Sequence, residues 1–210
     1  MADQLFYKNK ARNDFTPKNI GKKPPHDRIL IVCEGKVTEP LYFKELCSEL
    51  RLTNTVDIIG EECGSAPASV YEHTLKKLKE YGDYDRAYCV FDKDNHESYV
   101  TTLDAIKRNK KLNIIAINSV PCFEFWVLLH FEQTTSPFKN SAEVAKRIKR
   151  SWKKYDKEEI RDIYPWIKEK TYIAIKNSNL ILKNAQSDNP STLVHVLVKD
   201  LIDLSRKINS

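Results

Sequence analysis

Residues 29–40 of the chain read Ile-Leu-Ile-Val-Cys-Glu-Gly-Lys-Val-Thr-Glu-Pro. The segment 28–33 has the length and the β-branched content of a buried strand. Glu34 follows this strand directly, and Gly35 permits a sharp turn immediately after it. A second acid, Glu39, lies five residues beyond Glu34. The stretch therefore predicts a buried strand whose carboxyl end carries a carboxylate, and the question is what that carboxylate binds.

Three more apolar segments of the same kind follow, and stretches with helical spacing separate them. The four predicted strands cover residues 28–33, 56–60, 86–91 and 112–117. Strands that are mostly apolar and alternate with helices are typical of a parallel sheet covered on both faces. The sequence therefore predicts an α/β fold with a mostly parallel four-stranded sheet flanked by helices, of the Rossmann-like kind.

The second half of the chain predicts mainly helices. They are expected over residues 123–131, 142–152, 180–185 and 192–208, with Pro190-Ser191-Thr192 opening the last one. We expect the chain to have three parts. These are a flexible basic arm over residues 1–27, an α/β core over residues 28–131, and a helical C-terminal extension, packed on the core, over residues 132–210.

Composition narrows the class of protein without identifying a function. The 210 residues carry a formal net charge of +6, which permits a polyanionic partner such as nucleic acid. The five cysteines are dispersed and include no Cys-x-x-Cys pair, which argues against a disulfide framework and a zinc knuckle. No apolar run is long enough to cross a membrane, and the first residues contain no apolar signal core. We therefore expect a cytoplasmic protein with no membrane partner.

Two of the predicted strands end in acid. Glu34 follows the first strand, and Asp92 and Asp94 follow the third. Ligands of an open parallel sheet bind beyond the carboxyl ends of its strands, and side chains two residues apart on an extended chain point the same way. We expect these three carboxylates to converge and bind Mg²⁺ or Mn²⁺, since hard cations prefer oxygen ligands and relieve repulsion between carboxylates. The alternative is that the acids only cap helices or are solvated in loops.

A second block, residues 121–131, contains an acid and a histidine in a helix that is apolar nearly all round. Glu124, in the first turn, is expected at the same edge of the sheet, either as a fourth carboxylate or as a group that contacts the metal ligands. The alternative is that Glu124 only complements the helix dipole and binds backbone amides. His130 lies deeper in the helix and is expected to be a core histidine.

Four blocks of the chain are ILIVCEGKVTEPLYFKEL, VFDKDNH, PCFEFWVLLHF and NPSTLVHVLV. These blocks resemble those of the RloB-like proteins, a bacterial group associated with defence. The Glu-Gly after the first strand and the Asp-Lys-Asp after a later strand also resemble the TOPRIM signature of topoisomerases, primases and OLD-type nucleases, which implies a TOPRIM-like core. Glu39 is similar to the extra acid of the OLD-type branch, although Val37 adds a residue to the usual Glu-Gly-Lys-Thr-Glu loop.

The resemblance implies Mg²⁺-dependent phosphoryl transfer on nucleic acid. The residues expected to hold the metal are Glu34, Asp92 and Asp94. Those expected to complete the catalytic site, by helping to bind a second ion, are Glu39 and Glu124. Those expected to contact the substrate, as point charges or as a group that orients water or phosphate, are Lys36, Lys93 and His96.

A basic amphipathic segment offers a further surface for a polyanion. Its cationic side chains are Lys146, Arg147, Lys149, Arg150, Lys153 and Lys154. The segment either tracks the phosphate backbone of DNA or RNA or is simply a solvated helix face.

The sequence therefore supports one leading hypothesis and two others. The leading hypothesis is a Mg²⁺-dependent nuclease of a bacterial anti-phage or restriction-associated defence system, such as one that acts by abortive infection. The first alternative is a non-catalytic module, or a toxin or effector, controlled by an ATPase partner of the AAA or ABC type. The second is a primase-like nucleotidyl transferase. The sequence contains no P-loop of the Gly-x-x-x-x-Gly-Lys-[Ser/Thr] type, so we do not expect nucleotide hydrolysis of that kind.

Overall fold

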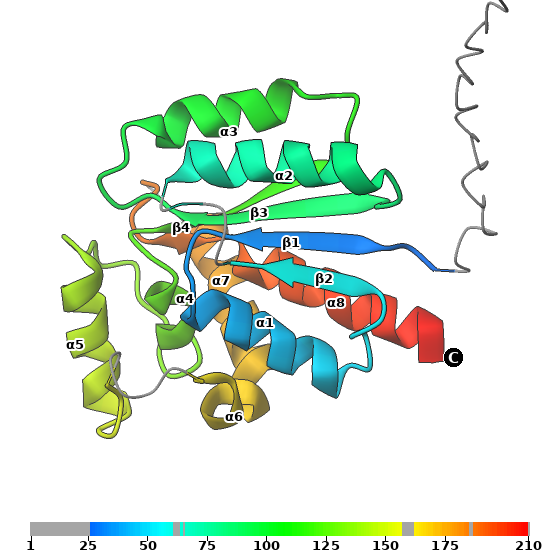
Figure 1. The fold of residues 1–210 in the computed structure, drawn as a ribbon. Helices are drawn as coiled ribbons and strands as arrows, with labels where there is room; N and C mark the ends of the chain where they lie inside the picture. Colours follow the sequence, from blue (N-terminus) through cyan, green and yellow to red (C-terminus); the bar gives the residue numbers. More distant parts are fainter. Residues whose placement is uncertain (1–25, 61–63, 65, 157–161, 185–186, 210) are drawn as a thin grey trace, which may run out of the picture.

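The computed structural model describes residues 26–60, 64, 66–156, 162–184 and 187–209. The arm expected over residues 1–27 therefore lies almost entirely outside the described residues. The described part forms three layers, with a central sheet between two layers of helices (Figure 1). This arrangement confirms the α/β class predicted from the sequence.

The sheet has five strands in the order β2-β1-β3-β4-β5. They are β1 (Ile29–Cys33), β2 (Val56–Ile59), β3 (Arg86–Asp92), β4 (Ile114–Val120) and β5 (Ser191–Thr192). The first four run parallel, as predicted, whereas the short β5 pairs antiparallel with the end of β4. The carboxyl ends of the four parallel strands consequently meet at one edge, on the left of Figure 1.

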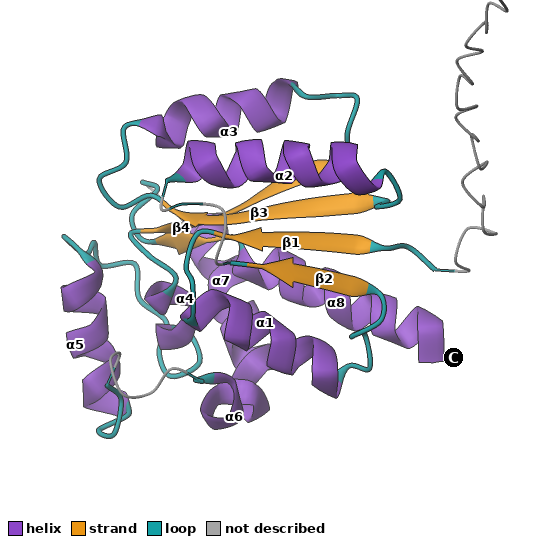
Figure 2. Ribbon diagram, in the orientation of Figure 1, coloured by secondary structure: helices purple, strands orange, loops and turns teal. Residues whose placement is uncertain are grey.

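Helices cover both faces of the sheet. They are α1 (Thr38–Glu49), α2 (Pro67–Tyr81), α3 (Ser98–Arg108), α4 (Glu124–Leu128), α5 (Ser141–Ser151), α6 (Tyr164–Ile167), α7 (Thr171–Asn184) and α8 (Val194–Asn209). In Figure 2, α2 and α3 lie on one face, and α1, α7 and α8 lie on the other, while α4 and α5 lie towards the carboxyl edge. No helix among the described residues is long and apolar enough to cross a membrane.

The burial of β1 on both faces of the sheet explains why this strand contains no polar residue. All five of its residues are buried, and they alternate between two cores. Ile29, Ile31 and Cys33 join the large core that includes residues of α1, α4, α7 and α8. Leu30 and Val32 join the smaller core under α2 and α3. Because side chains alternate along a strand, a strand covered on both faces must be apolar throughout.

The start of the last helix differs from the prediction. Ser191 and Thr192 form β5 instead of opening the helix, and α8 begins at Val194. The Thr192 hydroxyl lies 2.9 Å from Ser119 Oγ on β4, and it accepts a hydrogen bond from the Val194 N–H at 3.2 Å. The pairing with β4 is a tertiary contact, and it overrides the local tendency of Ser-Thr to begin a helix.

Gly60 lies where the end of β2, the loop after β1 and the start of α1 meet. A Cβ atom at Gly60 would lie 2.2 Å from Pro40 Cγ and 2.7 Å from the carbonyl oxygen of Gly35. Neither neighbour is the end of a flexible side chain, so one of the three segments would have to move. The absence of a side chain at Gly60 therefore sets how closely α1 packs beside the loop that carries Glu34.

We expect Gly60→Ala to lower the free energy of unfolding by about 1–3 kcal/mol, which is the usual cost of overpacking a tight contact. Urea denaturation at neutral pH measures this change. The control is Ser48→Ala, at an exposed position of α1, which should stay within about 0.5 kcal/mol of the parent. Equal stability of Gly60→Ala and the parent would contradict the close approach of these segments.

Candidate functional site

The crevice between β1 and β3 is the point at which the connections of the sheet diverge. From β1 the chain passes through α1 to β2 on one face, and from β3 it passes through α3 to β4 on the other face. The loops that leave these two neighbouring strands therefore separate, and ligands of open α/β sheets bind in the crevice that this separation creates. Glu34 follows β1 and Asp92 ends β3, so the two acids border this crevice.

Glu34 joins the ends of the two central strands. Its N–H donates a hydrogen bond to the Val90 carbonyl at 2.9 Å. One carboxylate oxygen accepts a hydrogen bond from the Asp92 N–H at 3.0 Å, and the other lies 3.0 Å from His96 Nε2. Burial raises the pKa of Glu34, although the N–H of Asp92 and the ring of His96 act against this. Both oxygens of the carboxylate are thus held by fixed partners.

Asp92 has acidic side chains on several sides. Burial raises the pKa of Asp92 well above its ordinary value, and the nearby carboxylates of Glu39 and Glu124 raise it further. The Phe123 N–H donates a hydrogen bond to the Asp92 carboxylate and acts in the opposite direction, while Glu34 again raises the pKa. Three carboxylates, from the loop after β1, the first turn of α1 and the start of α4, therefore lie within electrostatic reach of Asp92. No sequence pattern marks the contribution of the Phe123 N–H.

Glu39 reaches the site because Gly35 has no side chain. A Cβ atom at Gly35 would lie 1.9 Å from Glu39 Oε2, so the carboxylate folds back over the loop after β1. Glu39 is in the first turn of α1, where a negative charge also complements the helix dipole. The helix begins at Thr38 with Val37 as its N-cap. The additional residue Val37 therefore does not turn Glu39 away from the site.

Asp94 does not follow the strand alternation that was expected to align it with Asp92. The strand β3 ends at Asp92, and Asp94 has a φ of +30°, in the left-handed region. The two-residue repeat of an extended chain therefore stops before Asp94. Asp94 is exposed, and its charge raises the pKa of Glu34. Asp94 is thus near Glu34, but it is brought there by a turn and not by an extended strand.

The three residues expected to contact a substrate have different surroundings. His96 is in contact with the carboxylate of Glu34, as described above. Lys36 is exposed in the loop after β1. Lys93 Nζ lies 2.6 Å from the carboxylate of Asp188, in the segment before β5. Sequence patterns give no sign of Asp188, because only the pairing of β5 with β4 brings this segment to the site.

The helix α4 places Glu124 near the crevice and leads to His130 in the core. Glu124 is only 3% exposed and is in the first turn of α4. Burial, followed by the charge of Glu124, raises the pKa of Tyr155, a buried residue that the sequence did not mark. His130 Nδ1 lies 3.0 Å from the Trp126 carbonyl oxygen, and burial lowers the pKa of His130 to about 4. The structure therefore confirms His130 as a core histidine.

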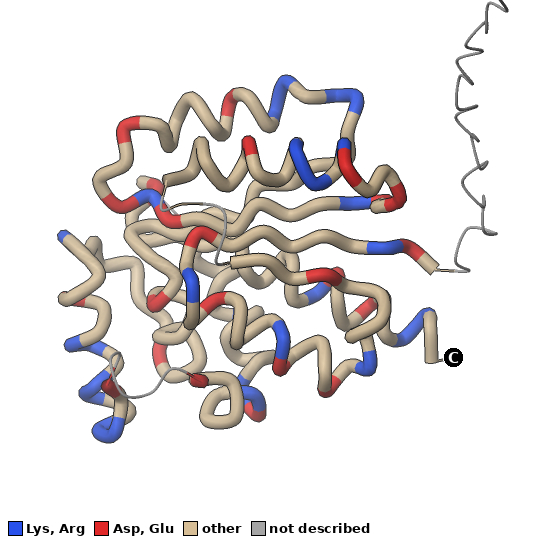
Figure 3. Tube along the Cα trace, viewed as in Figure 1, with Lys and Arg blue, Asp and Glu red and all other residues tan. Residues whose placement is uncertain are grey.

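The basic segment forms α5 and the residues after it, towards the carboxyl edge (Figures 1 and 3). Arg147 binds Glu132 with a shortest distance of 2.9 Å. Lys149 lies 3.1 Å from Asp156. The other cationic side chains of the segment are exposed, and they are Lys146, Arg150, Lys153 and Lys154. Part of the segment thus forms ion pairs, and the rest presents a basic face at the same end of the molecule as the carboxylates.

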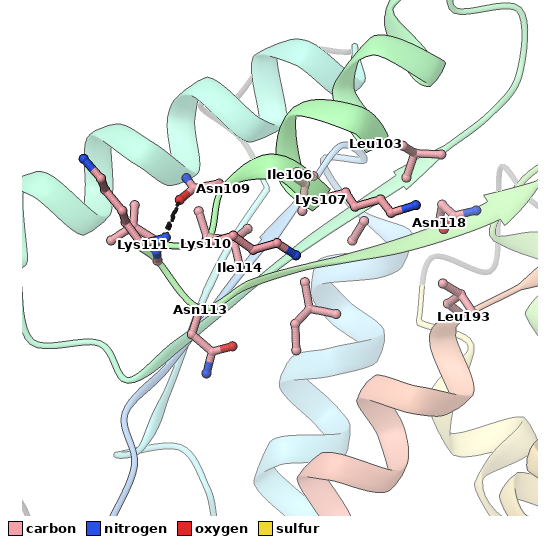
Figure 4. A pocket seen from close by; sticks show the side chains of 13 residues that line it. Leu103, Ile106, Lys107, Asn109, Lys110, Lys111, Asn113, Ile114, Asn118 and Leu193 are labelled. Atoms are coloured by element: carbon pink, nitrogen blue, oxygen red, sulfur yellow. Dashed lines mark hydrogen bonds between the residues drawn. The ribbon is translucent and has the colours of Figure 1, made fainter.

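A groove of about 670 Å³ lies in another region, between α3 and the first part of β4 (Figure 4). Lys107, Lys110 and Lys111 contribute to its lining, and none of the described residues that line it is acidic. The groove therefore lacks the carboxylates that a hard divalent cation requires. The acidic crevice, and not this groove, is the candidate site for the predicted chemistry.

The described part of the chain contains no group of three His, Cys, Asp or Glu side chains arranged as metal ligands. The donor chemistry at the crevice nevertheless suits Mg²⁺ or Mn²⁺, because Glu34, Asp92 and Glu124 offer only oxygen ligands. The raised pKa of Asp92 reflects burial and repulsion between these acids, which a bound cation would relieve. Glu34 and Asp92 border the crevice together, with Asp94 close to Glu34.

The fold and the site define an α/β protein with an acidic crevice at the point where the sheet connections diverge. A family model of the RloB-like proteins matches residues 29–201. The chain belongs to this family, as its sequence blocks indicated. Comparisons with curated proteins and with solved structures give no significant match.

We expect Asp92→Asn to keep or raise the stability of the metal-free protein at neutral pH. The pKa of Asp92 is higher in the folded chain than in the unfolded chain, so ionisation of its carboxyl destabilises the fold once the pH exceeds the ordinary pKa. The advantage of the variant should shrink as the pH falls to about 4, because the carboxyl of the parent is then increasingly protonated in both states. Thermal denaturation in EDTA over a pH series measures this difference.

The matched control is Asp200→Asn, which removes a carboxylate that is not crowded by the acids of the crevice. Asp200 accepts a hydrogen bond from the Tyr88 hydroxyl at 2.7 Å and lies 3.4 Å from Arg86 Nη1. Its neutralisation should lower the free energy of unfolding by about 1 kcal/mol. Equal losses of stability in Asp92→Asn and Asp200→Asn would show that Asp92 is not destabilised by its surroundings.

Proposed function

We propose that this protein is a phosphodiesterase that requires Mg²⁺ or Mn²⁺ and cleaves nucleic acid, within a bacterial anti-phage or restriction-associated defence system. The observation that carries the proposal is the gathering of Glu34, Asp92 and Glu124 at the crevice between β1 and β3. Burial raises the pKa values of two of these carboxyls, Glu34 and Asp92. Carboxyls of this kind in a cleft are typical of sites that bind cations or transfer protons.

In this proposal, backbone donors orient the carboxylates that hold the cation. The Asp92 N–H donates a hydrogen bond to Glu34, and the Phe123 N–H stabilises the ionised form of Asp92, so each carboxylate already has a backbone donor nearby. Asp94 is the proposed third ligand. A divalent cation bound at these residues supplies charge neutralisation at the phosphate group. The two remaining acids, Glu39 and Glu124, are proposed to help bind a second ion.

Cationic and imidazole groups border the same crevice and are proposed to contact the substrate. His96 Nε2 lies 3.0 Å from a Glu34 oxygen, which places the ring where it can orient a water or a phosphate. Lys36 is exposed in the loop after Glu34, and Lys93 directly follows Asp92. Each lysine offers a point charge to a phosphate oxygen.

Two resemblances to known proteins support the proposed reaction and its proposed biological role. The acids that follow β1 and β3 resemble the TOPRIM signature, which supports phosphoryl transfer on nucleic acid. Membership of the RloB-like family supports a role in defence. The exposed basic face of α5 supports a polyanionic substrate, DNA or RNA, because such a face lies towards the same edge as the acids.

One contact favours a second candidate function, a toxin or effector module controlled by an ATPase partner. Lys93 Nζ is 2.6 Å from the carboxylate of Asp188 instead of facing the crevice alone. A partner that moves the segment before β5 would release Lys93 for a phosphate. A primase-like nucleotidyl transferase is the third candidate and would use the same carboxylates.

We expect the purified protein to cleave DNA or RNA in Mg²⁺ or Mn²⁺ and to leave both intact in EDTA. Asp92→Asn and Glu34→Gln should each lower the cleavage rate by about 10²–10³-fold, because each variant keeps the size of the side chain but removes a proposed ligand charge. Toxicity in bacterial cells provides a second readout. The control is Asp57→Asn on β2, which removes an acid that binds Arg28 and should leave the rate unchanged.

Cleavage by Asp92→Asn at the parent rate would remove the catalytic assignment. Cleavage that occurs only after an ATPase partner is added would favour the second candidate instead.

We expect the affinity for nucleic acid to fall steeply with salt concentration, because cations released from the phosphate backbone drive such binding. Neutralising three exposed cations of the basic segment should make the slope of log affinity against log salt shallower by about 2. The three changes are Lys146→Gln, Arg150→Gln and Lys153→Gln. Fluorescence anisotropy at several salt concentrations measures the slope.

A control with equal change of charge uses exposed lysines of α2 and α3, and its slope should equal that of the parent. The control changes are Lys76→Gln, Lys79→Gln and Lys107→Gln. The same slope in both triple variants would leave the basic segment as a solvated helix face.

A further inference from the structure

Aromatic rings from three separate segments form a stack at the surface. The ring centres of Phe131 and Trp152 are 6.0 Å apart, and the ring planes meet at 28°. The ring centres of Trp152 and Trp166 are 5.7 Å apart, at 36°. Phe131 follows α4, Trp152 follows α5, and Trp166 belongs to α6. The first pair is stacked and the second is tilted, and both ring distances are favourable between aromatic rings, so the three segments present one continuous series of rings.

The two ends of this stack differ. Lys170 Nζ lies 4.5 Å from the centre of the Phe131 ring, and this cation–π contact covers that end. Trp166, at the other end, is 55% exposed, whereas Phe131 and Trp152 are partly buried. Trp166 therefore places a large aromatic surface in contact with water. A further planar ring can stack on Trp166, and burial of the exposed apolar surface of Trp166 would favour this contact.

Exposed cations neighbour the rings along the chain, and one of them, Lys170, contacts the Phe131 ring. They are Arg150, Lys153, Lys154 and Lys170. Proteins that bind single-stranded nucleic acid combine aromatic rings, on which bases stack, with cationic groups along the phosphate backbone. A duplex already has its bases stacked on one another, so it would engage the cations but not the rings.

The stack is also close to the acidic crevice. Trp152 contacts Tyr155, with ring centres 5.4 Å apart. Tyr155 is buried, and the charge of Glu124 acts on its hydroxyl. Glu124 acts in turn on Asp92. Tyr155 thus contacts Trp152 and lies within electrostatic reach of Glu124, so a strand bound on the rings could extend towards the proposed site of cleavage.

We propose that the surface formed by Trp166, Trp152 and the exposed cations is a base-stacking platform that selects single-stranded nucleic acid. This inference rests on the proposed function, because it names the form of nucleic acid that the crevice would cleave. A purely structural role for the stack, in packing α5 and α6 against α4, makes a different prediction. In that case Trp166 would affect only stability and would not distinguish single strands from duplexes.

The test measures binding by the full chain in EDTA, so that cleavage does not interfere. The probes are fluorescein-labelled oligothymidylate and oligouridylate of about twelve nucleotides and a DNA duplex of the same length. We expect the single strands to bind more tightly than the duplex and to quench tryptophan fluorescence. Trp166→Ala should weaken single-strand binding about tenfold and change duplex binding by less than about twofold. Trp166→Phe keeps a ring and should restore most of the affinity.

The matched control is Tyr172→Ala, on α7, because Tyr172 is 65% exposed but is not part of the stack. This variant should bind single strands as the parent does. Parent affinity in Trp166→Ala, or a preference of the parent for the duplex, would overturn the inference. Single-strand binding that depends on Trp166, without cleavage in Mg²⁺, would count against the proposed function alone. Cleavage in Mg²⁺ together with single-strand binding that does not depend on Trp166 would count against the stacking platform alone.

Discussion

The hydrogen bond from the Asp92 N–H to the Glu34 carboxylate joins the ends of the two central strands. All of β1 and the interior of β3 are buried in the cores on the two faces of the sheet, and the two strands pair side by side. The connections that leave them pass to opposite faces of the sheet, which opens the crevice in which ligands of such sheets bind. The positions of Glu39 and Glu124 depend on the segments beside this crevice. Glu39 can fold back over the loop because Gly35 has no side chain, and the first turn of α4 carries Glu124.

Crowded carboxylates destabilise a fold unless something neutralises them, so their presence at a rigid crevice indicates a functional demand. In the proposed function a divalent cation neutralises these carboxylates, and the surrounding surface binds the substrate. The helix α5, with its exposed cations, lies towards the same edge of the sheet as the acids. The rings of Trp152, which follows α5, and Trp166 are 5.7 Å apart between their centres. In the proposed function one substrate, a flexible polyanion with exposed bases, would engage the acids through the cation, the basic face and the rings.

The sequence predicted the features that depend on local pattern. The apolar run of β1 indicated a two-sided strand, and its position before Glu34 indicated the edge of the sheet. The pairing of β5, the short helix α6 and the full length of α7 depend on contacts between distant segments, so periodicity did not reveal them. At the site, Asp94 differed from expectation because a left-handed turn ended the strand alternation. The partners Phe123 and Asp188 were missed because one acts through its backbone N–H and the other reaches Lys93 only in the folded chain.

Anomalous diffraction from crystals soaked in Mn²⁺ would test the central claim most directly, because it locates the ion without reference to any activity. The account predicts an anomalous peak in the crevice, within coordination distance of carboxylate oxygens of both Glu34 and Asp92. It also predicts that the peak disappears in crystals of Asp92→Asn soaked in the same way. An anomalous peak located only at other carboxylates, or a peak of equal height in Asp92→Asn, would contradict the account.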